Sequence, residues 1–324
     1  MDFKGHMLIT GANGFIGRAL CKRLCNDNLR IRGAVRRVDT DFFPKGMEIV
    51  SVGDIGPHTD WSQALQGVEV VVHLAGRVHV MKDSAQDRLV EYRYVNTQGT
   101  KRLAEMAAVA GVRRFIYASS IKVNGEETHK RPFSETGVPC PQDPYAVSKL
   151  EAEQALQDIA RQTRLEIVIL RPPLVYGPEV RANFLKLIKI VDRGIPLPLK
   201  NIHNARSMIY IGNIVDAIIA CCAHDSAPGQ TFMVCDNETI STPELILHIA
   251  RALEKNPRLF PFPQAWLIAI GTILKKRAAA MRLLGSLTIS NTKIQRTLNW
   301  NPPFAMQEGL RLTVAWYAQN KTIV

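Results

Sequence analysis

Short apolar runs alternate with stretches of helical periodicity over the first half of the chain. We predict strands for the apolar runs Met7–Thr10, Arg30–Val35, Val68–Leu74, Arg113–Ser119 and Glu166–Leu170. Between the first two runs, Phe15–Leu24 carries apolar residues at the spacing of a helix. Alternating strands and helices predict an α/β fold with a doubly wound parallel sheet and right-handed crossovers. Such a sheet binds its ligand at the carboxyl ends of its strands.

The pattern changes after Pro172. Prolines cluster there, and the following elements become shorter and less regular. We therefore predict one domain over residues 1–172 and a smaller C-terminal α/β lobe over 173–324 that supplies most of the substrate pocket. The chain is expected to return in part to the first domain around residues 207–235.

The composition indicates a folded chain that meets an anionic partner. The 324 residues are 46% hydrophobic, which suffices for a large core, and the net charge is +12 at pH 7. The basic residues are scattered and no nucleic-acid-binding motif is present, so we expect no nucleic acid. A nucleotide, a diphosphate or an acidic membrane surface would suit this charge equally well.

The cysteines and the N-terminus indicate the cellular compartment of the protein and give no sign of a metal site. None of the six cysteines forms a C-x-x-C pair, and none is spaced with the eight histidines as in a metal site. We therefore expect free thiols, no bound metal and a cytoplasmic location. The chain enters a predicted strand almost at once, so no signal peptide is expected. The longest apolar run, Ala265–Leu274, is too short to span a bilayer, which needs about 20 residues.

A glycine series joins the first predicted strand to the first predicted helix. Gly11, Gly14 and Gly17 follow a G-x-x-G-x-x-G pattern. Glycine is needed where backbone approaches a phosphate and where helix and strand pack closely, and the helix start offers free N–H groups. The series predicts a dinucleotide site, for which an ordinary glycine-rich turn is the alternative. We assign to it the loop residues Gly11, Asn13, Gly14, Phe15, Ile16 and Gly17.

The end of the second predicted strand indicates which dinucleotide binds. An NAD site usually carries an acid there, but this chain has Arg36 and Arg37. Two guanidinium groups suit a 2′-phosphate, so we predict a preference for NADP(H), with NAD(H) possible. The alternative is a pair of solvated surface arginines. Asp54 and Ile55 are expected to face the adenine, and the small residues of Leu74-Ala75-Gly76 to leave room for the nicotinamide half.

Tyr145 and Lys149 form the predicted acid/base pair. Residues four apart share one face of a helix, and a lysine ammonium beside a tyrosine is expected to lower the phenol pKa from its usual value near 10. A hydroxyl must also orient the carbonyl of the substrate, and Ser119 and Ser120 end a predicted strand. The alternative is a surface Tyr/Lys pair at a helix start.

These motifs together resemble the extended short-chain dehydrogenase/reductase family, in particular its nucleotide-sugar epimerases, dehydratases and ketoreductases. The resemblance covers nearly the whole chain and rests on the glycine loop, His73–Gly76, Asn96, Ser119–Gly125, the Tyr145/Lys149 pair and Arg171–Pro178. It implies a Rossmann domain, a UDP-linked sugar as substrate, and a homodimer formed through helices around residues 97–110 and 146–162.

The resemblance also implies individual roles. Ser120 would orient the carbonyl and Tyr145 would serve as acid/base. Lys149 would lower the tyrosine pKa and hold the ribose of the cofactor. Asn96 would belong to the supporting network, and Pro172 would lie against the cofactor.

A second group of residues is implied for the substrate. Asn183 and Arg206 match positions that contact the diphosphate, although Asn183 could instead cap a helix and Arg206 could be solvated. Ser119 and Lys122 complete the candidate substrate contacts, with Arg282 as a further candidate for the diphosphate.

Two departures from the family pattern narrow the activity. The 4,6-dehydratases carry Asp-Glu directly after the catalytic hydroxyl, where this chain has Ile121 and Lys122, so elimination of water is not expected. Arg36 replaces the acid of the NAD-retaining epimerases and suits an exchanging NADPH.

The first hypothesis is therefore an NADPH-dependent reductase that acts on the C4 ketone of a UDP-4-keto-6-deoxy-N-acetylhexosamine for surface polysaccharide. The alternative is a 4-epimerase of UDP-glucose or UDP-N-acetylglucosamine with tightly bound NAD. A third reading, a protein that only senses the NADP(H) ratio, is disfavoured by the Tyr/Lys pair.

The segment from Phe262 to Leu287 is apolar and basic. It resembles the matching part of bacterial reductases that act on UDP-linked 6-deoxy-4-keto-N-acetylhexosamines. One hypothesis places it against the inner face of the membrane, and the alternative is an ordinary pair of lid helices.

Overall fold

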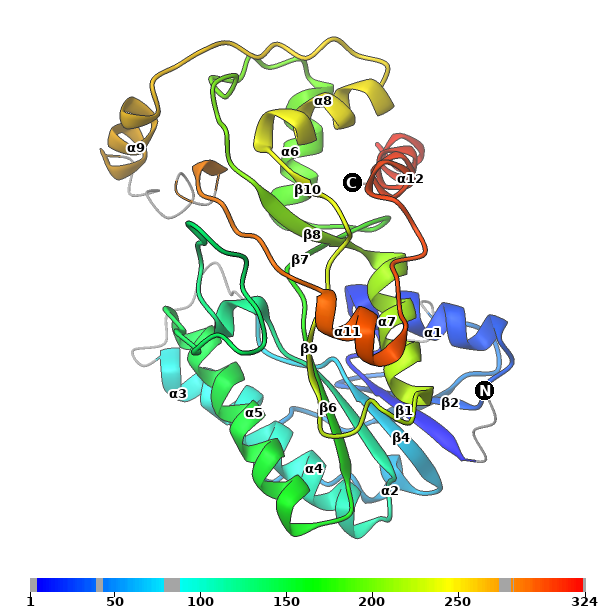
Figure 1. Cartoon of the computed structure of the whole chain (residues 1–324). Coiled ribbons are helices and arrows are strands. Elements are labelled where there is room, and N and C mark those ends of the chain that lie inside the picture. The colour runs from blue at the N-terminus through cyan, green and yellow to red at the C-terminus, as the bar shows by residue number, and fades with distance from the viewer. Residues whose placement is uncertain (1–4, 39–42, 79–87, 274–280, 282, 323–324) are drawn as a thin grey trace.

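The computed structural model of the chain describes residues 5–38, 43–78, 88–273, 281 and 283–322. Within these residues, seven parallel strands form one sheet in the order β3-β2-β1-β4-β5-β6-β9, seen in the lower half of Figure 1. The strands are β1 (His6–Thr10), β2 (Ile31–Val35), β3 (Glu48–Ser51), β4 (Val68–His73), β5 (Arg114–Ala118), β6 (Glu166–Arg171) and β9 (Thr231–Met233). The predicted α/β class and its doubly wound parallel sheet are confirmed.

Helices cover both faces of this sheet. One face carries α1 (Phe15–Asn26) and α7 (Ile211–Ala223), which contact each other. The helices on the other face are α2 (Ser62–Leu65), α4 (Thr100–Val109) and α5 (Pro144–Gln162). Two further segments, α3 (Arg88–Tyr92) and the π-helical turn η2 (Arg93–Gly99), lead into α4, and the short 3₁₀ turn η3 (Ile121–Val123) follows β5.

Burial on both faces explains why the strands are continuous apolar runs. In β4, Val70 and Val72 belong to the core beneath α1 and α7, whereas Val71 between them belongs to the core beneath α4 and α5. Successive strand residues point to opposite faces, so a strand that is covered on both sides needs apolar residues throughout.

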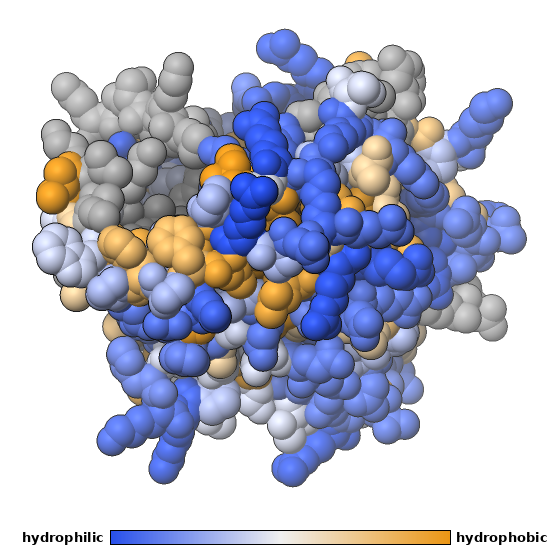
Figure 2. All heavy atoms as spheres, turned by 90° about the horizontal axis from the view of Figure 1, so that it is seen from above, coloured by the Kyte–Doolittle hydropathy of each residue, from blue (hydrophilic) through white to orange (hydrophobic). Residues whose placement is uncertain are grey.

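The smaller lobe lies above the sheet in Figure 1. Within the described residues it contains a second sheet in the order β10-β8-β7, formed by β7 (Leu174–Tyr176), β8 (Arg206–Tyr210) and β10 (Thr239–Ile240). Its helices include α6 (Ala182–Asp192), α8 (Thr242–Ala252), α9 (Gln264–Ile273) and α12 (Met306–Gln319). Helix α11 (Thr292–Leu298) instead contacts β9 of the large sheet. Seen from above, apolar side chains gather on one part of this lobe among hydrophilic ones (Figure 2).

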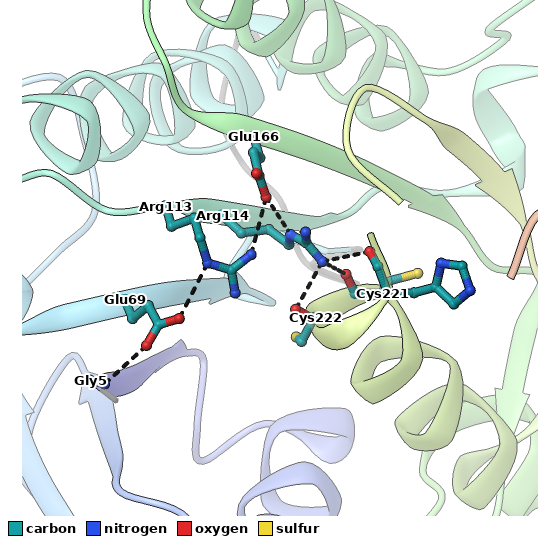
Figure 3. A network of polar contacts seen from close by, with 8 residues as sticks. Gly5, Glu69, Arg113, Arg114, Glu166, Cys221 and Cys222 are labelled. Carbon is teal, nitrogen blue, oxygen red and sulfur yellow. Dashed lines mark hydrogen bonds and ion pairs between the residues drawn. The ribbon is translucent and has the colours of Figure 1, made fainter. Parts of the chain in front are cut away.

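A buried arginine attaches α7 to the edge of the sheet where the strands begin. Figure 3 shows Arg114 at the start of β5, with its guanidinium directed toward the end of α7. One guanidinium nitrogen donates to the carbonyl oxygens of Cys221, Cys222 and His224, each at 2.9 Å, and Nε donates to Glu166 at 2.7 Å. The arginine therefore satisfies carbonyl groups that the end of a helix leaves without partners.

Replacement of Arg114 by leucine should destabilise the fold. The change leaves the last carbonyls of α7 buried without a donor, and we expect the free energy of unfolding to fall by about 2–4 kcal/mol. The measurement is urea denaturation followed by circular dichroism. Arg113→Leu is the matched control, because Arg113 shares Glu166 but its side chain is 38% exposed. A loss from Arg113→Leu as large as that from Arg114→Leu would contradict this account.

Candidate active site

The glycine loop between β1 and α1 has no room for side chains. A Cβ on Gly17 would lie 2.1 Å from the carbonyl oxygen of Gly11, and a Cβ on Gly11 would lie 2.9 Å from the amide nitrogen of Ala75. Gly11 also has a φ of +65°, which favours glycine. Helix packing thus requires both residues to be glycine.

The start of α1 is suited to an anion. Gly14 is the N-cap residue, no side chain among the described residues caps the helix, and its first turn contains no acid. Asn13 and Gly14 are exposed, while Phe15 and Ile16 are half-buried. An uncapped helix start with a positive dipole end fits the pyrophosphate of a dinucleotide.

A buried histidine at the end of β4 forms hydrogen bonds with β1 and with α4. His73 bonds through Nδ1 to the Thr10 hydroxyl at 2.6 Å and through Nε2 to the Thr100 hydroxyl at 2.9 Å. Burial, assisted by the Lys149 charge, lowers the pKa of His73 to about 3, so the ring is neutral at pH 7. The Thr10 hydroxyl also accepts the amide of Ala75 at 3.1 Å, which fixes the half-buried Leu74-Ala75 and the exposed Gly76 at the end of β4.

The residues predicted for the adenosine end lie together at the ends of β2 and β3. Arg36 Nε lies 2.8 Å from Asp54 Oδ1, and the two side chains are 73% and 81% exposed. Arg37 is exposed and Ile55 is half-buried. Two predicted cofactor contacts therefore pair with each other, an interaction that sequence spacing did not indicate. Solvent screens such an exposed pair, so a ligand could displace it at low cost.

The Tyr145/Lys149 pair stands at the start of α5. The helix begins with Asp143 as N-cap, whose carboxylate accepts the Ala146 amide at 2.7 Å, and Pro144 occupies the first turn. Lys149 Nζ donates to the carbonyl oxygen of Ala118 at 2.8 Å and lies 4.6 Å from the centre of the Tyr117 ring. Its distance to the Tyr145 ring centre is 6.0 Å. The helix and the end of β5 thus place the amine beside the tyrosine.

The expected lowering of the Tyr145 pKa is wrong for this structure. Burial raises the pKa of Tyr145 to about 12, and a hydrogen bond with Ser120 opposes the rise. Burial also lowers the pKa of Lys149 to about 8, which the Glu153 charge opposes. Burial removes the water around each group and so disfavours its charged form. This effect is larger than the mutual attraction that the four-residue spacing predicts.

The two serines have different surroundings. Ser120 is the N-cap of η3 and its hydroxyl accepts the Lys122 amide at 3.3 Å. Ser119 is buried, and its hydroxyl donates to Glu153 at 2.5 Å. Ser120 also forms a hydrogen bond with Tyr145, whereas Ser119 is already bonded within the protein interior. The role of Ser120 in orienting the carbonyl stays a prediction.

A buried ion pair links α5 to the end of β6. Glu153, one turn after Lys149, binds the guanidinium of Arg171 through both carboxylate oxygens, and both side chains are almost fully buried. Arg171 also donates to Asn124 at 2.9 Å. Sequence analysis missed Glu153, although its place four residues after Lys149 on the same helix face was a usable signal.

Asn96 connects the loop after β4 to α5. Its side-chain amide donates to the carbonyl oxygen of Arg77 and to the Ser148 hydroxyl, both at 3.0 Å, and its oxygen accepts the Arg77 amide at 2.7 Å. It lies in η2, and π-helical turns are frequent at functional sites. These bonds join Asn96 to the start of α5, and its role in the supporting network stays a prediction. The Pro172 carbonyl similarly accepts the Ile121 amide at 3.0 Å and joins η3 to the end of β6.

Tyr92 was not predicted. Its ring meets that of Tyr145 edge-on with centres 6.0 Å apart, so it forms a wall of the site. No motif marks it, because it lies outside the segments that carry the resemblance.

The candidate substrate residues are spread over several elements. The amine of Lys122 forms ion pairs with Glu126 and Asp143, which ties it to the start of α5. Asn183 is exposed on α6, whose N-cap is the neighbouring Arg181. Arg206 is half-buried and donates to the Gly285 carbonyl at 3.1 Å, and Arg282 lies outside the described residues. Among the described residues, no group of three or more His, Cys, Asp or Glu side chains is placed to hold a metal ion.

Comparison with known proteins agrees with this arrangement. The family model described as "NAD dependent epimerase/dehydratase family" matches residues 7–235. The UDP-glucose 4-epimerase of Vibrio cholerae is 41% identical over 317 residues, which cover 97% of this chain and 95% of that protein.

Among solved structures, MoeE5 in complex with UDP-glucuronic acid and NAD has a TM-score of 0.79 at 25% identity, with 98% of this chain and 100% of that chain covered. The UDP-glucuronic acid 4-epimerase of Bacillus cereus in complex with NAD has a TM-score of 0.78 at 23% identity, with 97% and 99% covered, and shows the same fold. The glycine loop, the Tyr/Lys pair and these matches establish that the chain belongs to the NAD-dependent epimerase/dehydratase family.

Proposed function

We propose that the protein is a 4-epimerase of a UDP-linked hexose, with UDP-glucose or UDP-N-acetylglucosamine as the first substrates to test. The observation that carries this proposal is the likeness to the Vibrio cholerae UDP-glucose 4-epimerase, which extends over 97% of the chain. It reverses the order of the two hypotheses drawn from sequence, in which the reductase stood first.

The cofactor proposed for this activity is NAD held by the glycine loop. NAD supplies a hydride acceptor that can return the hydride. The packed glycines leave backbone exposed at Asn13 and Gly14, and the uncapped start of α1 suits the pyrophosphate. Lys149, beside Tyr145, is proposed to hold the ribose.

Tyr145, Ser120 and Lys149 are proposed to handle the proton at the C4 oxygen. Once the Tyr145/Lys149 pair has lost one proton, the ionised Tyr145 would accept the C4 hydroxyl proton during oxidation of the sugar. It would return this proton when the ketone is reduced on its opposite face. Ser120, bonded to Tyr145, is proposed to hold the C4 oxygen during both steps.

A C4 ketoreductase that uses NADPH is the second candidate. It is favoured by Arg36, which stands where an NAD site usually carries an acid and whose exposed pairing with Asp54 leaves it open to a 2′-phosphate. Its substrate would be the UDP-4-keto-6-deoxy-N-acetylhexosamine considered above.

Purified protein should interconvert UDP-glucose and UDP-galactose, or their N-acetyl forms, without added cofactor. Chromatography of the nucleotide sugars is the measurement. Tyr145→Phe should lower kcat by about 10²–10⁴-fold, because it removes the proton carrier. Tyr94→Phe is the matched control, since this tyrosine is exposed on η2. Oxidation of NADPH with a 4-keto sugar, in the absence of epimerisation, would replace this proposal with the reductase.

The pH dependence of kcat/KM should separate the two activities. The lowered Lys149 pKa of about 8 means that the Tyr145/Lys149 pair holds both protons below pH 8 and has lost one above it. Epimerisation begins with removal of a proton from the sugar, so kcat/KM should rise as pH increases through about 8. Ketone reduction needs the fully protonated pair, so a fall above pH 8 would contradict the epimerase.

Arg36→Ala tests the cofactor. If NAD is the cofactor, the ratio of NAD to NADP affinity should change by less than about threefold, because an exposed arginine contributes little to a ligand without a 2′-phosphate. Isothermal titration with each dinucleotide gives the ratio, and Arg164→Ala, at an exposed arginine after α5, is the control. If the wild-type protein prefers NADP and Arg36→Ala lowers its NADP affinity tenfold or more, the result would support the reductase instead.

A further inference from the structure

Exposed apolar side chains lie on α9 and on the segment before it, in the smaller lobe. They are Phe260, Trp266 and Ile273, whose exposed fractions are 41%, 63% and 79%. We call these three residues, together with the exposed Lys200 and Arg258 of the segments joined to α9, the apolar edge. The view from above shows apolar side chains gathered at one side of this lobe (Figure 2), and Figure 1 places α9 at its outer limit.

Helix α9 carries this surface on one side. Trp266, Ala269 and Ile273 are all exposed and recur at the three- and seven-residue spacings of one helix face. Gly271 is buried, and Leu267 packs against the core of the lobe. The helix therefore has a side attached to the protein and an opposite apolar side without a partner among the described residues.

Hydrogen bonds join the backbone segments that carry the two cations to each other and to the start of α9. The Leu197 amide donates to the Arg258 carbonyl at 2.8 Å, and the Lys200 amide donates to the Phe260 carbonyl at 3.2 Å. The side chain of Gln264, the first residue of α9, donates to the Asn201 carbonyl at 3.3 Å. The exposed Lys200 and Arg258 thus lie on two hydrogen-bonded segments, which also carry Phe260 and adjoin the start of α9.

The segments that carry the apolar edge contain cations and no acid. The sequence has no aspartate or glutamate from residue 193 to 215 or from 255 to 307. Lys200 and Arg258 form no ion pair among the described residues, so their charge is available to a partner. The single sign, in a chain with a net charge of +12, favours a partner that is both apolar and anionic.

We propose that the apolar edge contacts an anionic membrane surface. Tryptophan and aliphatic side chains on one face of a helix, with lysine and arginine on the adjoining segments, match the layered structure of a lipid headgroup region. The contact would be peripheral, since no helix in the described part of the chain has the length and apolar character to cross a membrane. This inference goes beyond the proposed epimerase activity and does not depend on it.

Co-sedimentation with lipid vesicles tests the proposal on the full-length protein. We expect binding to vesicles of phosphatidylglycerol mixed with phosphatidylcholine, little binding to phosphatidylcholine alone, and weakening with added salt. The double variant Trp266→Ala/Ile273→Glu should lower the bound fraction by about tenfold or more, and Lys200→Glu/Arg258→Glu should weaken binding to the anionic vesicles.

Val138→Glu is the matched control, because Val138 is an 87% exposed apolar residue between η3 and α5, in the other domain. Its binding to vesicles should equal that of wild type, and light scattering of each variant reports its oligomeric state. Absence of wild-type binding to anionic vesicles would overturn the proposal, as would equal binding by the Trp266/Ile273 variant. An oligomer that dissociates in that variant, without vesicle binding by wild type, would show that a second copy covers the surface instead.

Discussion

The buried ion pair between Glu153 and Arg171 is the interaction on which the rest of the candidate site depends. It joins the helix that carries Tyr145 and Lys149 to the end of β6, and through Ser119 and Asn124 it reaches the loop that carries Ser120. A buried charge is tolerated only when it is paired and hydrogen-bonded, so neither partner can move without a large cost. This constraint fixes the position of α5 against the sheet. It also keeps a negative charge one turn from Lys149, which opposes the loss of the lysine proton through burial.

The edge of the sheet where the strands begin and the edge where they end contribute differently to the protein. Where the strands begin, Arg114 and Glu166 attach α7 and contribute to stability (Figure 3). Where the strands end, Gly11 and Gly17 approach each other closely at the start of α1, and Ser120 and Tyr145 lie after β5 and at the start of α5. The smaller lobe closes over this second edge. Such a division of stability and chemistry follows from a parallel sheet, because all its strands end on one side.

Much of the frame could be predicted from sequence for a physical reason. Strands buried on both faces read as apolar runs, so β1, β2, β4, β5 and β6 were each located to within one residue or so. The glycine loop could be predicted equally well, because only glycine fits where a Cβ would clash with backbone atoms. The site was less predictable. The Glu153–Arg171 pair depends on contact between elements far apart in the chain, and the raised pKa of Tyr145 depends on burial, which a Tyr-x-x-x-Lys spacing does not report. The pairing of Arg36 with Asp54 similarly needed the relative placement of β2 and β3.

The central proposal is that the Tyr145/Lys149 site, with NAD bound, removes hydride from C4 of a UDP-hexose and returns it to the same carbon. The most direct measurement follows UDP-glucose labelled with deuterium at C4 through epimerisation, with mass spectrometry of the product and of the solvent. The account predicts that UDP-galactose retains the deuterium at C4 and that the reaction shows a primary isotope effect. Loss of the deuterium to water, or its replacement by hydrogen from added NADPH, would contradict it.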